Sequence, residues 1–288
     1  MRIKMMQKYV KSPMNYTGGK YKLLPQMLPL FPNGGSILGK FIDLFCGGGN
    51  VSINVNASLI VANDFDSHVI EIYKEFQKNS IKHILNHIEN RIEEYDLSIT
   101  NSDGFNKFRN YYNSCEYKNP LDLFVLICYS FNHQFRFNGN GGFNMPFGKE
   151  RSCFNKSIKQ NLIKFKERIS NITFTNNSFE ELKIDKLSPN DFVYCDPPYL
   201  ITCATYNEKD GWNKSMERKL LDLLDKLNEK GIKFALSNVL YNKGKVNETL
   251  LEWSDKYTVH HLNNTYANCN YHTKDKENKA DEVLITNY

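Results

Sequence analysis

Apolar runs that end at glycines or acids alternate with amphipathic stretches in the first third of the chain. The run Phe41–Phe45 leads directly into Gly47, and a second run, Leu59–Ala62, ends at Asp64. Apolar side chains then recur at helical spacing over residues 69–76. A strand with a glycine turn, followed by a strand that ends at an acid, is the usual opening of a nucleotide-binding α/β unit.

The same alternation returns after residue 170. Short apolar runs predict strands over Ile172–Thr175, Asp191–Tyr194, Ile232–Ser237 and Glu282–Thr286. A leucine-rich stripe predicts a helix over residues 215–230, which the following glycine ends. The two ends of the chain together therefore predict an α/β fold.

The middle of the chain has a different character. Residues 78–165 contain a polar helical region, an apolar helix near 121–131 and a run, 135–146, in which aromatics alternate around an Asn-Gly turn. Such a run indicates a β-hairpin. We expect a subdomain at 78–165 inserted into a catalytic core formed by residues 1–77 and 166–288.

Composition excludes only a few classes of protein. Across 288 residues the net charge is +5, a modest excess that suits a polyanionic partner without indicating one. The seven cysteines form no C-x-x-C pair and no zinc-site spacing, so we expect reduced thiols and no metal. No apolar stretch approaches the ~18 residues of a membrane span, and the N-terminus lacks the apolar core of a signal peptide. We expect a cytoplasmic protein with no membrane partner.

The most informative residues follow a predicted strand. Asp196, Pro197, Pro198 and Tyr199 lie at its carboxyl end, where open α/β sheets bind ligands. Methylation of the exocyclic N6 amine of adenine needs acceptors for its two hydrogens, since its lone pair is delocalised into the ring. The Asp196 carboxylate and the Pro197 carbonyl supply these acceptors, and Tyr199 offers a ring for stacking the base. A plain proline turn at the end of a strand is the alternative.

The glycine motif upstream supports a nucleotide-like cofactor. Glycines after a strand let a ligand approach the backbone at Phe45 and Gly47, and Asp64 lies where an acid often binds ribose hydroxyls. The motif alone fits a nicotinamide-binding fold about as well. Its spacing is not G-x-G-x-x-G, and no second dinucleotide signal accompanies it.

A third candidate segment lies near the N-terminus. Tyr16-Thr17-Gly18-Gly19-Lys20 opens a stretch with apolar side chains at helical spacing over residues 20–29. Lys20 can neutralise a cofactor carboxylate, and Tyr16 can pack on the cofactor. An ordinary loop-to-helix junction is the alternative for these residues.

Together these segments resemble the DNA adenine methylases of the alpha group of amino-methyltransferases, with most likeness to the Dam enzymes of T-even phages. The resemblance rests on seven collinear stretches: Tyr16–Lys20, Asp43–Gly49, Asn63-Asp64, Pro146–Lys149, Asp191–Thr202, Ile232–Leu240 and Asp281–Ile285. Their order, with an inserted recognition domain before D-P-P-Y, is far more specific than any single motif.

The resemblance implies S-adenosylmethionine as methyl donor and double-stranded DNA as substrate. It implies cofactor contacts at Tyr16, Lys20, Asp64 and Asp196, with Phe179 on the cofactor adenine. It also implies a Rossmann-like sheet whose last strand is inserted antiparallel. A monomer is the expected state, because one copy suffices to act on each strand.

Under this resemblance the hairpin at 135–146 becomes the sequence reader. Arg136 can pair with guanine O6 and N7, and Pro146 can contact a thymine methyl group. Lys149 and Arg151 can hold phosphates. Where the phage enzyme reads P-F-G-K-R, this chain has Glu150 in the last position. Arginine favours guanine there, whereas glutamate accepts from a cytosine amine, so GATC is expected with CATG as the alternative.

Two other functions remain open from the sequence. Methylation of RNA adenine or of a protein amide uses similar acceptor geometry, although the inserted hairpin favours duplex DNA because A-form RNA hides its major groove. A catalytically silent DNA-binding regulator is the other, and the intact Asp196–Tyr199 and glycine motifs speak against it.

Overall fold

The computed structural model describes residues 9–202, 211–263 and 280–288. The chain folds into two compact units. Residues 1–19, 47–53 and 66–174 form one, here called the helical unit, and residues 20–46, 54–65 and 175–288 form the other, the sheet unit. The chain passes between them five times. Three of these crossings lie within or beside the stretches Tyr16–Lys20, Asp43–Gly49 and Asn63-Asp64 that the sequence singles out. The functional boundaries predicted at 78 and 165 remain a proposal.

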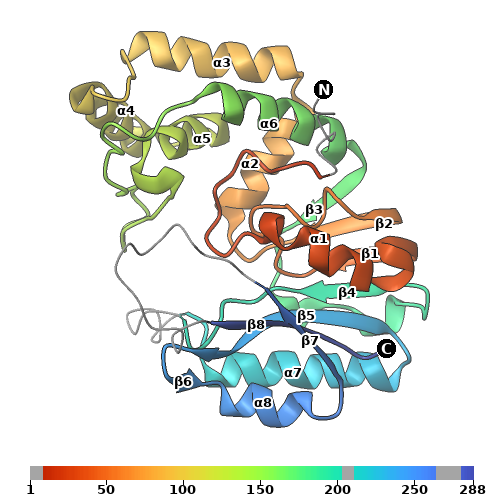
Figure 1. Cartoon of the computed structure of the whole chain (residues 1–288). Helices are drawn as coiled ribbons and strands as arrows, with labels where there is room; N and C mark the ends of the chain where they lie inside the picture. Colours follow the sequence, from red (N-terminus) through yellow and green to blue (C-terminus); the bar gives the residue numbers. More distant parts are fainter. Residues whose placement is uncertain (1–8, 203–210, 264–279) are drawn as a thin grey trace, which may run out of the picture. The chain divides into compact units, whose positions relative to one another are not determined.

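The strands of the sheet are ordered β3-β2-β1-β4-β5-β8-β7, with β6 paired to β5, and all of them except the first three residues of β3 belong to the sheet unit (Figure 1). Their bounds are β1 Ser36–Asp43, β2 Asn56–Asn63, β3 Ile172–Thr175, β4 Phe192–Cys195, β5 Lys233–Asn242, β6 Lys245–Val246, β7 Thr258–Leu262 and β8 Asp281–Thr286. Strand β1 pairs in parallel with β2 and β4, and β4 pairs in parallel with β5. Strand β8 is antiparallel to both β5 and β7. The Rossmann-like sheet with an antiparallel last strand is thus confirmed.

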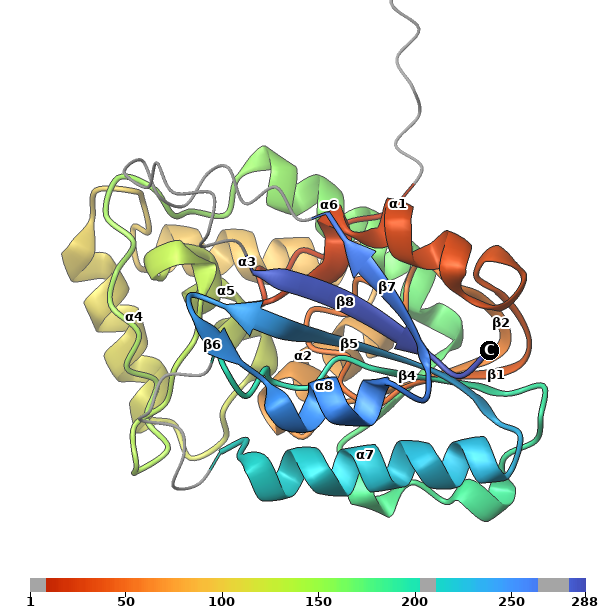
Figure 2. The ribbon, with the colours of Figure 1, turned by 60° about the horizontal axis from the view of Figure 1, so that its bottom comes forward.

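Helices α7 (Lys214–Glu229) and α8 (Glu248–Ser254) cover one side of this sheet (Figures 1 and 2). The leucine stripe of α7 is buried, and Leu224 packs in one apolar cluster with Val193 and Phe234. Gly231 follows α7 with φ of +68°, a left-handed conformation that glycine adopts without strain. The helix predicted over 215–230 and its glycine stop are confirmed.

The helical stretch predicted over residues 20–29 is broken into short turns. It consists of η1 (Lys20–Lys22), α1 (Leu24–Met27) and η2 (Leu28–Leu30), followed by η3 (Pro32–Gly34). Prolines stand at the start of α1 and of η2. Since proline donates no backbone hydrogen bond, the apolar spacing survives while the continuous helix does not. Two further short turns, η6 (Phe179–Glu181) and η7 (Ile184–Lys186), complete the sheet unit.

The helical unit is centred on α5. Its helices are α2 (Ser67–Lys78), α3 (Ile81–Glu94), α4 (Ser102–Ser114), α5 (Pro120–Tyr129) and α6 (Lys156–Arg168), with η4 (Phe131–His133) and η5 (Ile169–Asn171). Every residue of α5 is buried, and α2, α3 and α4 pack around it. Asparagine, serine or aspartate side chains cap the amino ends of α2 to α6, which explains where each begins.

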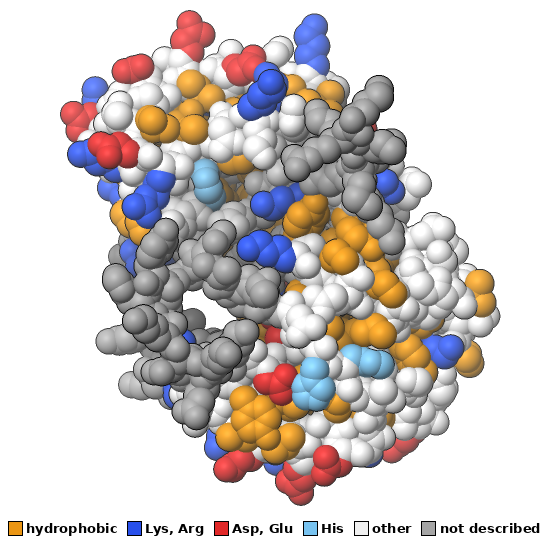
Figure 3. Space-filling view, viewed as in Figure 1, with side chains coloured by type: hydrophobic (Ala, Val, Ile, Leu, Met, Phe, Trp, Pro, Cys, Tyr) orange, Lys and Arg blue, Asp and Glu red, His pale blue; other side chains and the backbone are white. Residues whose placement is uncertain are grey.

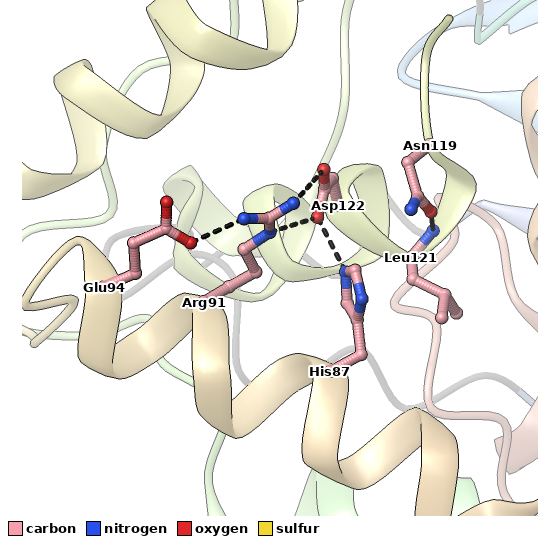
Figure 4. A network of polar contacts seen from close by, with 6 residues as sticks. All are labelled: His87, Arg91, Glu94, Asn119, Leu121 and Asp122. Atoms are coloured by element: carbon pink, nitrogen blue, oxygen red, sulfur yellow. Dashed lines mark hydrogen bonds and ion pairs between the residues drawn. The ribbon is translucent and has the colours of Figure 1, made fainter.

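One carboxylate interrupts the apolar α5. Asp122 Oδ1 lies 2.7 Å from His87 Nε2 and 2.8 Å from Arg91 Nε, and Arg91 Nη2 donates to Asp122 Oδ2 at 3.3 Å (Figure 4). Burial raises the pKa of Asp122, but the hydrogen bonds from His87 and Arg91 outweigh it and hold that pKa below its ordinary value. The cluster fastens α3 to α5.

The predicted hairpin at 135–146 forms, with Phe137 and Phe143 as its bridge. The Asn138 side chain accepts hydrogen bonds from the backbone of Asn140 and Gly142, which closes the tip. On α4, Asn113 donates to the Phe143 carbonyl and accepts from its backbone N–H. Hydrogen bonds to asparagine side chains therefore take the place of the backbone ladder found in a longer hairpin.

Among the described residues, no helix is long and apolar enough to cross a membrane.

Candidate active site

Asp196 lies where the sequence predicts, directly after β4. All four residues of β4 are buried between parallel neighbours, so the chain leaves the carboxyl edge of the sheet at Asp196. The Asp196 side chain is 18% exposed. Pro197 is buried and Pro198 is exposed. This arrangement fixes the turn while leaving the carboxylate accessible to a ligand.

Lys20 lies against this carboxylate and against a second one. Lys20 Nζ is 2.9 Å from Asp196 Oδ1 and 3.6 Å from Glu282 Oε1. The Tyr199 hydroxyl is 3.0 Å from the same Asp196 oxygen and 3.2 Å from Glu282 Oε1, so its single hydrogen is donated to one carboxylate or shared by both. The Lys20 ammonium also lies 4.9 Å from the centre of the Tyr199 ring. These four residues are here called the Asp196 cluster.

The Asp196 cluster has two carboxylates for one ammonium. Burial raises the pKa of Asp196 above its ordinary value, Lys20 opposes this rise, and the Glu282 charge adds to it. Burial also raises the pKa of Tyr199 well above its ordinary value, as do both carboxylates, so the phenol is neutral at physiological pH.

Glu282 was not among the residues singled out from the sequence. It lies on β8 opposite Val239 of β5 and is 3% exposed. In the sequence, Glu282 stands out only as a charged residue directly before the apolar run Val283–Ile285 of the last strand. Only the antiparallel insertion of β8 beside β5 brings it to Lys20.

Asp64 lies at the carboxyl end of β2 and is 8% exposed. Asn63 ties the neighbouring loops together: its side chain donates to the carbonyls of Leu44 (3.1 Å) and Asn177 (2.9 Å). Asn176 in turn donates to the carbonyls of Asp64 and Phe65. The loops after β1, β2 and β3 therefore meet, and they hold the acid in place.

An aromatic cluster lies in the same unit. The Phe179 ring centre is 5.6 Å from that of Phe45 and 5.7 Å from that of Trp212, and Phe45 and Trp212 are 5.6 Å apart. The sequence predicted cofactor contacts at Phe45 and Phe179 but missed Trp212. It also missed Phe65, which directly follows Asp64 and is 79% exposed. An aromatic side chain this exposed beside a buried acid is a candidate ligand contact.

Tyr16 and Gly47 are in contact within the helical unit. A side chain on Gly47 would place its Cβ 2.8 Å from Tyr16 Cδ1, and Gly47 has φ of +43°, so only glycine suits this position. Tyr73 donates to the Gly47 carbonyl at 2.8 Å. The Tyr16 ring centre also lies 6.1 Å from that of Phe135 in the hairpin. The cofactor contacts predicted for Tyr16 and Gly47 remain predictions.

The predicted DNA-reading residues lie in and after the hairpin. Arg136 is exposed and donates to the Asn144 side chain at 2.9 Å and to its carbonyl at 3.2 Å. Pro146 is exposed, and its carbonyl accepts from Phe131 at 2.8 Å. The Arg136–Asn144 pair holds the guanidinium of Arg136 at the hairpin.

The segment after Pro146 presents the remaining three candidates. Lys149, Glu150 and Arg151 are all exposed. Glu150 has φ of +58° and its backbone donates to the Ile99 carbonyl at 2.7 Å, while the Arg151 guanidinium lies 5.1 Å from the Phe131 ring centre. Their roles toward bases and phosphates remain predictions. The sequence also suggests DNA contacts along Tyr199–Tyr206 and Asn263–Asp275. Of these two segments, residues 203–206 and 264–275 lie outside the described residues.

The chain is similar to known methyltransferases over nearly its whole length. A family model, "D12 class N6 adenine-specific DNA methyltransferase", matches residues 16–268. The type II methyltransferase M.FokI of Planomicrobium okeanokoites is 53% identical over 287 residues, which cover 97% of this chain and 43% of that protein. The modification methylase StsI of Streptococcus sanguinis is 46% identical over all of this chain and 44% of that protein.

This chain thus spans less than half the length of these two relatives. The DNA adenine methylase of Escherichia coli K12 is 25% identical and is matched over 85% of its length, with 86% of this chain. The resemblance to the DNA adenine methylases is confirmed: the chain belongs to the D12 class of N6 adenine-specific DNA methyltransferases.

Proposed function

We propose that this protein transfers the methyl group of S-adenosylmethionine to N6 of adenine within a short duplex DNA site. The observation that carries the proposal is the Asp196 cluster, because its carboxylate is accessible, fixed by Lys20 and Tyr199, and followed by a rigid proline turn. Family membership supports the same chemistry. The proposed substrate and partner is double-stranded DNA. The protein would act on it as a monomer in the cytoplasm.

The residues of the sheet unit suit the cofactor. Asp64 would accept hydrogen bonds from the ribose hydroxyls, and the Phe65 and Phe179 rings would enclose the adenine. S-adenosylmethionine supplies an electrophilic methyl group on a positively charged sulfur. The carboxylates of Asp196 and Glu282 favour a cationic ligand beside them. Lys20 would meet the cofactor carboxylate. The cofactor contacts predicted from the sequence for Tyr16 and Gly47, which belong to the helical unit, are part of the same proposal.

Two acceptors act on the amine. Both polar partners of Asp196 among the described residues contact Oδ1, so Oδ2 would accept one N6 hydrogen. The Pro197 carbonyl accepts the other hydrogen. These hydrogen bonds concentrate the lone pair on N6, which forms the new bond to carbon as the sulfur–carbon bond breaks. N6 then loses one proton, and Asp196 accepts it at Oδ2 because its raised pKa brings it closer to that task.

Access to N6 requires the adenine to leave the duplex. Extrusion of a base costs a few kcal/mol of unstacking. The hairpin at 135–146 would read the flanking base pairs in the major groove, with Arg136 on a guanine. GATC is our proposed site, with CATG as the alternative that Glu150 favours. Lys149 and Arg151 would contact phosphates.

Sequencing of plasmid DNA that reports base modification directly tests this function. The chain is expressed in a host free of adenine methylation, and the plasmid is read molecule by molecule. Modified adenine within one short motif supports the proposal and identifies the site. Unmodified plasmid from cells that contain folded protein contradicts it and directs the search to RNA.

A further inference from the structure

The hairpin formed by β5 and β6 is a surface that the function above leaves unused. Strand β5 pairs with β4 only as far as Leu236, opposite Cys195. It continues to Asn242, and β6 folds back beside it, as Figure 2 shows at one end of the sheet. Because β4 and β5 are parallel, this extension leaves the same edge of the sheet as Asp196.

The tip of this hairpin is tight. Lys243 and Gly244 have φ of +49° and +76°, which is the geometry of a two-residue turn whose twist matches its strands. Val239 of β5 lies opposite Glu282, a member of the Asp196 cluster. The tip at Lys243 is four residues beyond Val239, which corresponds to about 13 Å at ~3.3 Å per residue. The tip is therefore held close to the site and directed away from the sheet.

The side chains on the tip suit a nucleic acid backbone. Lys243 and Lys245 are exposed, and among the described residues neither has an ion-pair partner. Tyr241 and Val246 lie opposite each other and are each 41% exposed. Figure 3 shows hydrophobic side chains at the surface in the region where Figure 1 places β6.

The tip itself, residues 241–246, carries two lysines and no acid. The acids nearest in the hairpin's own segments are Glu248, which is exposed, and Asp281, whose carboxylate lies 2.8 Å from His261 Nδ1. Two unpaired ammonium groups beside an exposed tyrosine form a surface for phosphates with an apolar contact for a sugar or base edge. A protein partner would more often require a larger apolar area.

We propose that the β5–β6 hairpin binds the DNA backbone beside the target adenine, with Lys243 and Lys245 on phosphates and Tyr241 against the sugars. This inference rests on the proposed function. The ~13 Å from Val239 to the tip corresponds to roughly four nucleotides along one strand, since B-DNA rises 3.4 Å per nucleotide. The contact is independent of sequence and adds to that of the reading hairpin at 135–146.

The test compares two double variants of the full chain. Lys243→Gln/Lys245→Gln removes the proposed contacts. The control Lys226→Gln/Lys233→Gln removes the same charge near the opposite end of β5, at exposed positions on α7 and β5. Binding of a duplex is measured over a range of salt concentrations, together with KM for DNA and the affinity for S-adenosylmethionine.

The hairpin variant is expected to bind DNA about 10- to 50-fold more weakly at 0.1 M salt, with a slope of log affinity against log salt smaller by about 1–2. KM for DNA should rise in parallel while cofactor affinity and site preference stay as in the wild type. Equal slopes and affinities for the hairpin variant and the control would overturn the proposal. A wild-type protein that neither binds nor methylates DNA would overturn the proposed function and this inference together.

Discussion

Two carboxylates set in buried surroundings behave in opposite ways in this molecule. Asp122 in the helical unit is held by His87 and Arg91, and its pKa lies below the ordinary value. Asp196 in the sheet unit shares the single ammonium of Lys20 with Glu282, and its pKa lies above the ordinary value. Burial raises the pKa in both places, so the balance of neighbouring charge decides the outcome.

The difference separates a structural role from a chemical one. The Asp122 carboxylate is paired with His87 and Arg91 within the protein and is therefore not available to a ligand. Asp196 has a second carboxylate, Glu282, beside its ammonium partner Lys20, and its pKa is raised. Perturbed carboxylates of the second kind gather at active sites. Replacement of each carboxylate by its amide tests whether Asp122 and Asp196 differ in role in this way.

The largest effect is expected for Asp196→Asn. The amide cannot accept a proton and places a donor where an acceptor is needed, so methyl transfer should fall by at least about 10³-fold, or about 4 kcal/mol. Stability in urea should be unchanged or slightly higher, because burial disfavours the charge that is removed. A variant that turns over at near-normal rate would refute the acceptor role.

The matched change, Asp122→Asn, should act on stability alone. It leaves Arg91 facing a neutral partner, and breaking a buried ion pair costs about 3–5 kcal/mol of unfolding free energy. Urea titration followed by circular dichroism measures this loss. Methyl transfer per folded molecule should stay within about twofold of the wild type. A loss of methyl transfer as large as that of Asp196→Asn would contradict a purely structural role for Asp122.

Acid should stop activity before it unfolds the protein. Catalysis needs the Asp196 carboxylate, whose pKa is raised, so kcat should decline at a pH above the ordinary carboxyl value of 3.8. The stabilisation from Asp122 is complete above the pKa of the unfolded chain and is lost only as pH falls through its lowered folded pKa. Activity and ellipticity measured on the same samples check this order; coincident losses would contradict it.

A smaller effect is expected at the reading hairpin. Arg136→Ala should reduce discrimination at one base pair by about 1–3 kcal/mol. Since Asn144 holds the Arg136 guanidinium, Asn144→Ala should relax the same base pair, and the double variant should lose no more than Arg136→Ala alone. Competition between duplexes that differ at single positions measures each effect. An unchanged preference in Arg136→Ala would remove it from the reader role.

Local patterns predicted those parts of the fold that depend on neighbours in sequence. The strand at Ile172–Thr175 and the helix ended by Gly231 follow from periodicity and turn chemistry. Strand β7 was missed because only one of its five residues is fully buried. The apolar spacing over residues 20–29 predicted one helix, but the prolines in this stretch interrupt it.

The candidate site shows the same limit. Asp196 and Tyr199 are three residues apart and form a recognisable motif. Glu282 and Lys20 are far from them in sequence and meet only through the sheet order, since β8 enters beside β5. Trp212 and Phe65 had no motif, and only their contacts and exposure single them out.

The most direct measurement is nucleoside analysis of duplex DNA after incubation with the purified protein and methyl-labelled S-adenosylmethionine. Digestion and mass spectrometry identify the atom that gains the label. We expect the label in N6-methyldeoxyadenosine with the wild type and with Asp122→Asn, and none with Asp196→Asn. Label on cytosine, or equal labelling by Asp196→Asn, would contradict the assignment of adenine N6 as the acceptor and of Asp196 as the residue that directs the methyl group to it.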